Sequence, residues 1–313
     1  MMIAKQYIGE SHPVKQVLDV VSISSSSYYY KPKQGRKGRS KSIYTYTQDG
    51  TRLTESEVLT YIKEVLSEEF VDYGYLKVTH WLRQHKDCVI NAKKVYRIMS
   101  EHGLLNKNKP KKRSNRQWVK QLVPPAKQAF DYLQIDIKYV YVGHQRRNAL
   151  ILSVIDVKTR WILGHIMKWS INKHDVINLF DQIFAVYPMA KQFYVRNDNG
   201  TQFTAAVVQQ YFEHKENVVQ EFCKPATPQQ NAHIESYHSI MERVVCQRFE
   251  FENLPDCQQT MNRFVQFYNY KRIHSGVGYI SPYKYLLEAD IDMGNYYLEN
   301  VLDCSNSEKE ILV

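Results

Sequence analysis

The chain has 313 residues and a mass of 37.0 kDa, and 43% of its residues are hydrophobic, which allows about two domains with a sizeable core and excludes a disordered chain. No apolar run approaches the ~18 residues of a membrane span, and the opening MMIAKQYIGESHP lacks the apolar segment of a secretory signal. The five cysteines form no C-x-x-C pair, so we expect neither a disulfide scaffold nor a cysteine-rich zinc site, and a reducing cytosol fits.

The formal net charge of +10 is concentrated in two short segments. Residues 31–41 hold six basic residues, residues 107–127 hold eight, and neither segment holds an acid. Without these residues the chain has 28 basic against 32 acidic residues. Both segments suit contact with nucleic-acid phosphates. The alternative is that they are solubilising linkers.

The amino-terminal third is predicted to be helical. Residues 1–45 read as a short helical segment and a basic linker, and residues 46–106 as a small all-α domain. In that domain Thr54 and Glu57 form a capping-box pattern, and Asn91 is placed to cap a later helix that ends at Gly103.

The helix after Asn91 carries Lys93, Lys94 and Arg97 on the face away from its apolar stripe. A short helix, a tight turn and a basic helix predict a helix–turn–helix DNA-binding domain, whose second helix enters the major groove. An ordinary helical bundle with a solvated charged face is the alternative. Residues 107–126 then read as a basic linker.

Residues 127–288 are predicted to form an α/β domain, followed by a tail at 289–313. Strands are expected at 131–142, 149–157, 160–169, 192–196 and 218–223, and helices at 173–186, 204–214, from 233 onward and at 256–270. The order β-β-β-α-β-α-β-α predicts a mixed five-stranded sheet with flanking helices, close to the ribonuclease-H order.

Three carboxylates in this domain are candidates for chemistry. Asp136 lies within an apolar strand, on the face opposite Leu133 and Ile135, where a dry unpaired charge is costly. Asp198 follows a strand end, and Glu235 lies near a helix start. Taken singly, each has a plain alternative: a solvated sheet face, an Asn/Asp/Gly turn, and a favourable interaction with the helix dipole.

Together the three carboxylates can converge on hard divalent cations. Oxygen ligands suit Mg²⁺ or Mn²⁺. Two such ions can support an in-line displacement at phosphorus, one at the attacking oxygen and one at the leaving oxygen. We therefore expect Asp136, Asp198 and Glu235 to be catalytic residues and ligands of two metal ions.

The ordered motifs of the chain resemble those of bacterial transposases of the insertion-sequence-three group, within the retroviral-integrase-like superfamily. The resemblance covers about residues 13–288 and rests on LQIDI at 133–137, RNDNGTQF at 196–203, TPQQNAHIES at 227–236, YNYKRIHSGVGYISP at 268–282, and the upstream YGY at 73–75 and KVYRIM at 94–99. It identifies Asp136, Asp198 and Glu235 with the family's catalytic carboxylates, and Asp156 with an aspartate that is not catalytic.

The chain departs from the family pattern in one spacing and at three positions. One residue more than usual separates Asp198 from Glu235. Leu133 stands where a tryptophan is often found, three positions before Asp136, and Lys138 where a threonine is usual. Glu242 stands where a basic residue is usual, seven positions after Glu235. Arg243 is therefore the better candidate for a DNA contact from that helix.

The resemblance implies a DNA transposase that cuts the element ends with water and joins the freed 3′-hydroxyl to a second phosphodiester, through copy-out intermediates. Its partners would be double-stranded DNA at the terminal repeats and the target, a second copy of the chain, and in many cases an upstream reading-frame product. The protein would be cytoplasmic and nucleoid-associated in a bacterium, with no membrane contact.

Further residues are assigned to DNA contact. Alongside the basic helix and Arg243, the candidates are Lys111, Lys112, Arg113, Asn199, Asn231 and Arg272. Turn and cap chemistry is the alternative for the two asparagines, and a structural role is the alternative for Arg272. His274 is either an acid that titrates near neutral pH or a hydrogen-bonded histidine beside Tyr279.

Two rival functions stay open. A catalytically silent accessory or repressor protein of the same element would bind the element ends without cutting them. A simple nuclease of the ribonuclease-H class would need neither the helix–turn–helix domain nor the basic segments.

Overall fold

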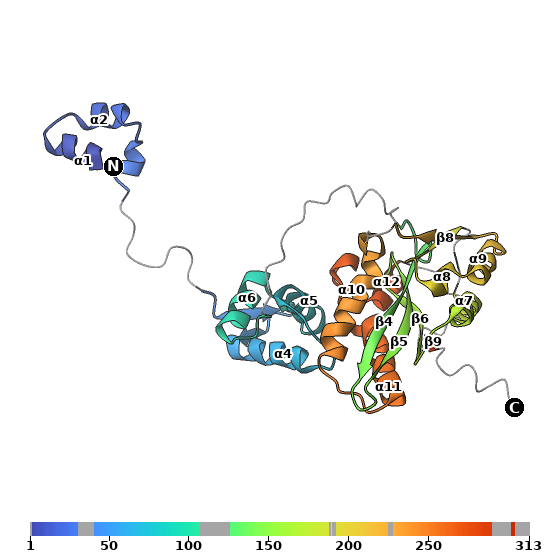
Figure 1. Cartoon of the computed structure of the whole chain (residues 1–313). Coiled ribbons are helices and arrows are strands. Elements are labelled where there is room, and N and C mark those ends of the chain that lie inside the picture. Colours follow the sequence, from blue (N-terminus) through green and yellow to red (C-terminus); the bar gives the residue numbers. More distant parts are fainter. Residues whose placement is uncertain are drawn as a thin grey trace. The chain divides into compact units, whose positions relative to one another are not determined.

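The computed structural model describes residues 2–30, 41–106, 126–187, 189, 192–224, 228–289 and 302–303 (Figure 1). The chain divides into two compact units, residues 1–43 and residues 44–313. In the part of the chain that the structure describes, no helix is both long and apolar enough to cross a membrane. The cysteines in that part, Cys88, Cys223, Cys246 and Cys257, are all free thiols.

The first unit consists of short helices. They are α1 (Met2–Gly9), α2 (Val14–Val20) and α3 (Ser25–Tyr28). Ala4 and Leu18 are buried in it, and the Ser24 hydroxyl accepts a hydrogen bond from the Ser27 amide and so caps α3. The helical segment predicted for residues 1–45 is therefore present.

The second unit begins with the predicted helix–turn–helix region. Its helices are α4 (Glu55–Ser67), α5 (Tyr75–His85) and α6 (Ala92–Glu101). The Thr54 hydroxyl accepts from the Glu57 amide while the Glu57 carboxylate accepts from the Thr54 amide, so the capping box is confirmed. The Asn91 side chain accepts from the Lys94 amide at 2.9 Å, and Gly103 has φ +68° after the helix, as the sequence predicted.

The prediction of an all-α domain is wrong, because a small antiparallel sheet precedes and joins these helices. Its order is β2-β1-β3, with β1 (Tyr44–Thr47), β2 (Arg52–Thr54) and β3 (Cys88–Val89). Alternating aromatic and β-branched residues surround a turn at Asp49-Gly50, where Gly50 has φ +87°. That turn is the sequence signal of the hairpin, and the domain begins at Tyr44.

The central sheet confirms the predicted strand order. Its order in space is β8-β7-β4-β5-β6-β9, with β4 (Tyr132–Val142), β5 (Arg147–Asp156), β6 (Ile162–Lys168), β7 (Phe193–Asn197), β8 (Val218–Phe222) and β9 (Leu302–Asp303). Strands β4, β5 and β6 form an antiparallel meander, and β7 and β8 run parallel to β4. The sixth strand, β9, lies in the predicted tail and was not expected, since a two-residue pairing leaves no sequence pattern.

Helices cover both faces of this sheet (Figure 1). They are α7 (Lys173–Val186), α8 (Thr201–Thr204), α9 (Ala206–Glu213), α10 (Ala232–Met241), α11 (Leu254–Gln266) and α12 (Pro282–Glu288), with the 3₁₀ segments η2 (Pro228–Asn231) and η5 (Ser275–Val277) and the π-helical turns η3 (Glu242–Cys246) and η4 (Phe267–Lys271). Leu133 and Ile135 of β4 pack with α7 and α9 in one core. Val140 and Val142 pack with α10 and α11 in the other. The face of β4 that carries Asp136 is therefore covered by helix, and the alternative of a solvated outer face is wrong.

Asp156, at the end of β5, accepts hydrogen bonds from the turn that follows it. It is fully buried and accepts hydrogen bonds from the Phe130 amide at 3.2 Å and from both the amide and the hydroxyl of Thr159 at 2.8 and 2.6 Å. Burial raises the pKa of this carboxyl to about 6, although these hydrogen bonds oppose the rise. Its role is structural, in agreement with a non-catalytic assignment.

We predict that Asp156→Ala lowers the free energy of unfolding by about 3 kcal/mol, because several buried donors lose their acceptor. Urea unfolding followed by circular dichroism measures the change, and Glu213→Ala, at an exposed position of α9, is the control with an effect below about 0.5 kcal/mol. A loss for Asp156→Ala no larger than that of the control would show that the turn does not depend on this carboxylate.

Candidate active site

Asp136 and Asp198 lie at matching positions on neighbouring parallel strands. The β4–β7 register pairs Gln134 with Arg196, and each aspartate is two residues further along its own strand. Asp136 lies within β4, whereas Asp198 is the first residue after β7 and is exposed. The topology thus brings the two carboxylates to one level of the sheet, at the end where β7 opens into a turn.

Gln134 fixes the start of α10 over this part of the sheet. Its buried side chain accepts from the His233 and Ile234 amides at 3.0 and 3.1 Å and donates to the Gln230 carbonyl at 3.0 Å. The side chain of a strand residue therefore satisfies the free amides at the helix start, in place of a cap from Asn231. Glu235 is the next residue of the helix, so its position relative to Asp136 is set by Gln134.

The third predicted carboxylate, Glu235, interacts electrostatically with Asp136. Burial raises the pKa of Glu235, and the negative charge of Asp136 raises it further. The Cys223 thiol, just beyond β8, has a pKa raised to about 11, chiefly by burial; Arg196 opposes the rise, while Asp198, Asp136 and Glu235 all add to it. The charge of each predicted carboxylate therefore acts on this one buried thiol.

Each aspartate is engaged by local partners. Asp136 Oδ1 accepts from the Ile137 amide at 2.8 Å, and Asp198 Oδ1 accepts from the Gly200 amide at 2.9 Å. Within the described residues, no three His, Cys, Asp or Glu side chains are close enough to hold a metal ion. The carboxylate oxygens of Asp136, Asp198 and Glu235 are ligands of the kind that a hard divalent cation prefers. Each aspartate keeps a second carboxylate oxygen, Oδ2, that accepts neither of these hydrogen bonds.

His238 is a site residue that the sequence analysis missed. Its Nδ1 lies 3.4 Å from Asp136 Oδ2, and its Nε2 is buried without a hydrogen-bond partner. The signal in the sequence is the Glu-x-x-His spacing of Glu235 and His238, because residues three apart share a helix face. Gln134 was missed as well, since its capping role depends on a helix that follows it by about a hundred residues.

Two predicted DNA contacts are instead engaged with Asp72, in the loop between α4 and α5. Arg243 donates to Asp72 from Nε and Nη2 at 3.2 and 3.0 Å, and Arg272 donates to the other oxygen at 2.6 Å. Burial alone would raise the pKa of Asp72, but the charge and hydrogen bond of Arg272, together with the charges of Lys77 and Arg243, outweigh burial and lower the pKa. The Arg272 side chain is only 2% exposed, so its DNA-contact prediction is wrong and the structural alternative holds.

On the basic helix α6, one of the three predicted DNA-contacting residues is exposed. Lys93 is exposed, whereas the Lys94 ammonium group donates to the Tyr44 carbonyl at 2.5 Å. Arg97 pairs with Glu55 at 2.6 Å and Glu101 at 2.8 Å. The remaining predicted basic contacts, Lys111, Lys112 and Arg113, lie outside the described residues.

The polar candidates divide between the surface and the interior. Asn199 is exposed and donates to the Cys223 carbonyl at 2.9 Å. Asn231 is buried and donates to the Ile135 carbonyl at 3.2 Å; its burial disfavours a DNA contact, and its side chain does not cap α10. Burial lowers the pKa of His274 well below its usual range, which rules against an acid that titrates near neutral pH. The Tyr279 amide donates to the His274 carbonyl at 2.9 Å, while the Tyr279 ring stacks on His80.

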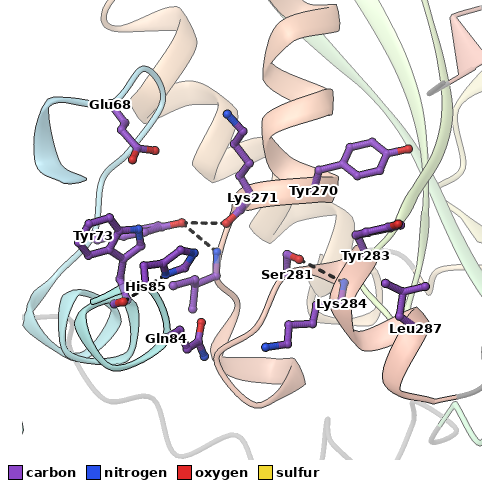
Figure 2. Close-up of a pocket in the computed structure, with 12 residues that line it drawn as sticks. Glu68, Tyr73, Gln84, His85, Tyr270, Lys271, Ser281, Tyr283, Lys284 and Leu287 are labelled. Atoms are coloured by element: carbon purple, nitrogen blue, oxygen red, sulfur yellow. Dashed lines mark hydrogen bonds between the residues drawn. The ribbon is translucent and has the colours of Figure 1, made fainter. Parts of the chain in front are cut away.

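A separate pocket of about 610 Å³ lies between α5 and the segment around α12. Figure 2 shows Tyr73 bridging the two sides, with its hydroxyl accepting from the Ile273 amide at 2.9 Å and donating to the Lys271 carbonyl at 3.5 Å. None of the three carboxylates lines this pocket. It belongs to the junction between the helix–turn–helix region and the core, and not to the candidate active site.

Known families match both parts of the second unit. A family described as HTH-like domain matches residues 54–113, and two families described as integrase core domain match residues 126–228 and 216–282. The chain is 27% identical over 247 residues to the insertion element IS407 uncharacterized 31.7 kDa protein of Burkholderia multivorans, covering 78% of this chain and 86% of that protein.

Two further relatives carry transposase names. The transposase for insertion sequence element IS904 of Lactococcus lactis is 26% identical over 238 residues, covering 73% of this chain and 93% of its own length. The putative transposase InsK for IS150 of Escherichia coli is 23% identical over 285 residues, covering 89% and 95%.

Among solved structures, a simian T-cell lymphotropic virus intasome aligns with a TM-score of 0.44 at 11% identity, covering 71% of this chain and 73% of that chain. The HTLV-2 integrase catalytic core domain in complex with magnesium aligns with a TM-score of 0.38 at 12% identity, covering 52% and 97%.

We predict that Asp136→Asn lowers the pKa of Glu235, because the substitution removes the negative charge that opposes ionisation of Glu235. The measurement is a titration of the Glu235 carboxyl ¹³C resonance, assigned with Glu235→Gln. Asp181→Asn, which alters a carboxylate bonded to Tyr211, is the control and should leave the titration unmoved. An unchanged Glu235 titration in Asp136→Asn would mean that the two carboxylates are not neighbours.

Proposed function

Because the chain carries an HTH-like domain followed by an integrase core domain, as insertion-element transposases do, we propose that it is a DNA transposase that cuts the ends of its element and joins them to a second site. The observation that carries the proposal is the matched position of Asp136 and Asp198 on parallel strands, with the start of α10 fixed beside them by Gln134.

The reaction consists of two phosphoryl transfers. A water oxygen bonds to the phosphorus at the element end and the bond to the 3′ oxygen breaks, so a 3′-hydroxyl is freed. That hydroxyl oxygen then bonds to a second phosphorus and displaces another 3′ oxygen. Phosphoryl transfer asks the protein mainly to position the reactants and neutralise charge.

The three carboxylates are the proposed ligands of two Mg²⁺ or Mn²⁺ ions. When bound, such ions neutralise the developing charge and favour ionisation of the attacking water. Asp136, Asp198 and Glu235 supply hard oxygen ligands, and His238 lies beside Asp136. The HTLV-2 integrase core, which shares the integrase name, is described in complex with magnesium.

The DNA partners follow from the domain order. The helix α6 would meet the terminal repeat through Lys93, and the basic segments would meet phosphates along the duplex. Joining two ends requires at least two copies of the chain on DNA, with an upstream reading-frame product as a further partner. A bacterial cytoplasm with access to the nucleoid is the expected location.

A catalytically silent DNA-binding protein of the same element is the second candidate. The observation that favours it is the lack of a ready three-residue metal site among the described side chains. A simple nuclease is disfavoured because it needs no HTH-like domain.

We predict that the purified chain nicks and joins a duplex copied from the DNA flanking its own gene, in the presence of Mg²⁺ or Mn²⁺. Asp198→Asn should reduce both steps by a factor of at least about 10³ and leave duplex binding intact, since it removes a metal ligand and not the fold. The readout is denaturing gel analysis of labelled strands. Binding without cutting in both proteins, even with an upstream partner added, would support the silent-protein alternative.

We predict that Lys93→Ala weakens duplex binding and reduces the slope of log affinity against log salt by about one, because one phosphate contact is lost. Lys63→Ala, at an exposed lysine of α4, is the control with no change in slope. Fluorescence anisotropy over a salt series gives both slopes. Equal slopes for wild type and Lys93→Ala would remove Lys93 from the interface.

A further inference from the structure

A row of polar side chains on β4 faces a row of positions on α10. Gln134 bonds the amides of His233 and Ile234, Asp136 meets His238, and Lys138 meets Glu242, the first residue of η3. Two residues of strand advance by about 6.7 Å, and four residues of helix by about 6 Å. The strand and the helix therefore run in step, and Lys138 is the next position beyond Asp136 on the same face.

Lys138 and Glu242 form an ion pair at the open end of this row. The ammonium nitrogen lies 2.7 Å from Glu242 Oε2, and the two side chains are 18% and 43% exposed. The hydrogen bond from Lys138 lowers the pKa of Glu242, so the glutamate is anionic at neutral pH. Pairs with this much exposure contribute little to stability, because water screens and solvates both charges.

Lys138 is a cation beside a negatively charged part of the sheet. Asp136 precedes it by two residues on the same face of β4, and Asp198 is at the matching position after β7; these carboxylates repel a DNA backbone. Arg243, next to Glu242 on the helix, is engaged by Asp72 and by the Ser239 carbonyl at 2.9 Å. Lys138 is thus the basic residue on the Asp136 face of β4. Its ion-pair partner, Glu242, is partly exposed to solvent.

We propose that Lys138 binds a backbone phosphate of the DNA strand that enters the site, and that Glu242 holds the Lys138 ammonium group in the DNA-free protein until the phosphate displaces it. The proposal rests on the proposed transposase function and assigns a DNA contact to the strand instead of the helix. It also relates two of the positions that depart from the family pattern, Lys138 and Glu242, which form an ion pair in the fold.

The test measures affinity for a short duplex of mixed sequence in EDTA, so that no cutting occurs, between about 50 and 200 mM salt. Lys138→Gln should weaken binding by about fivefold and reduce the salt slope by about one, whereas Lys138→Arg should retain both. Glu242→Gln should tighten binding by a similar factor, and this gain should vanish in the Lys138→Gln/Glu242→Gln double variant.

Glu288→Gln is the control for a general change of charge, because Glu288 faces Lys284 on α12 in another exposed pair. Thermal melting of each variant establishes that it is folded. A gain from Glu242→Gln that persists without Lys138, or that Glu288→Gln reproduces, would overturn the proposal, as would unchanged binding by Lys138→Gln. The nicking assay with Asp198→Asn is independent of these affinities, so failure of the transposase proposal would appear there and not here.

Discussion

The candidate site depends on the packing of α10 along β4. A buried glutamine cannot remain unpaired in an apolar core, and Gln134 meets this requirement by bonding the free amides at the start of α10 and the Gln230 carbonyl. The helix start is thereby fixed over the strand, and Glu235 and His238 are carried to Asp136. The positions of these candidate residues therefore follow from the hydrogen bonds of Gln134.

The arrangement of charge is the second constraint. The negative charge of Asp136 raises the pKa of Glu235, and each aspartate is held by a local amide. A bound cation would stabilise this site, because it would offset the repulsion between Asp136 and Glu235. The Lys138–Glu242 pair lies at the edge of this negative region, where an exchange of partners costs little.

The junction between the helix–turn–helix region and the core is a third organised element. Asp72 serves both Arg243 of the catalytic-domain helix segment and the buried Arg272, and the Tyr73 hydroxyl bonds the backbone of Ile273. The same two residues, Asp72 and Tyr73, therefore join the helix–turn–helix region to the two ends of the long helical segment that follows Glu235. Residues that sequence reasoning assigns to DNA are engaged here in holding the parts of one unit together.

The sequence by itself determined the order of the strands, the caps at Thr54 and Asn91, and the three candidate carboxylates, because these depend on local periodicity, turn chemistry and motif order. It did not determine that the Asp136 face is covered, that Gln134 caps α10, that His238 meets Asp136, or that Lys138 pairs with Glu242. Each of these contacts joins residues about a hundred positions apart, and only the packing of α10 along β4 decides which of them meet. Arg272 illustrates the same limit: its charge suggests a surface contact with DNA, but the fold buries it against Asp72, since burial is a property of the packed chain and not of the residue.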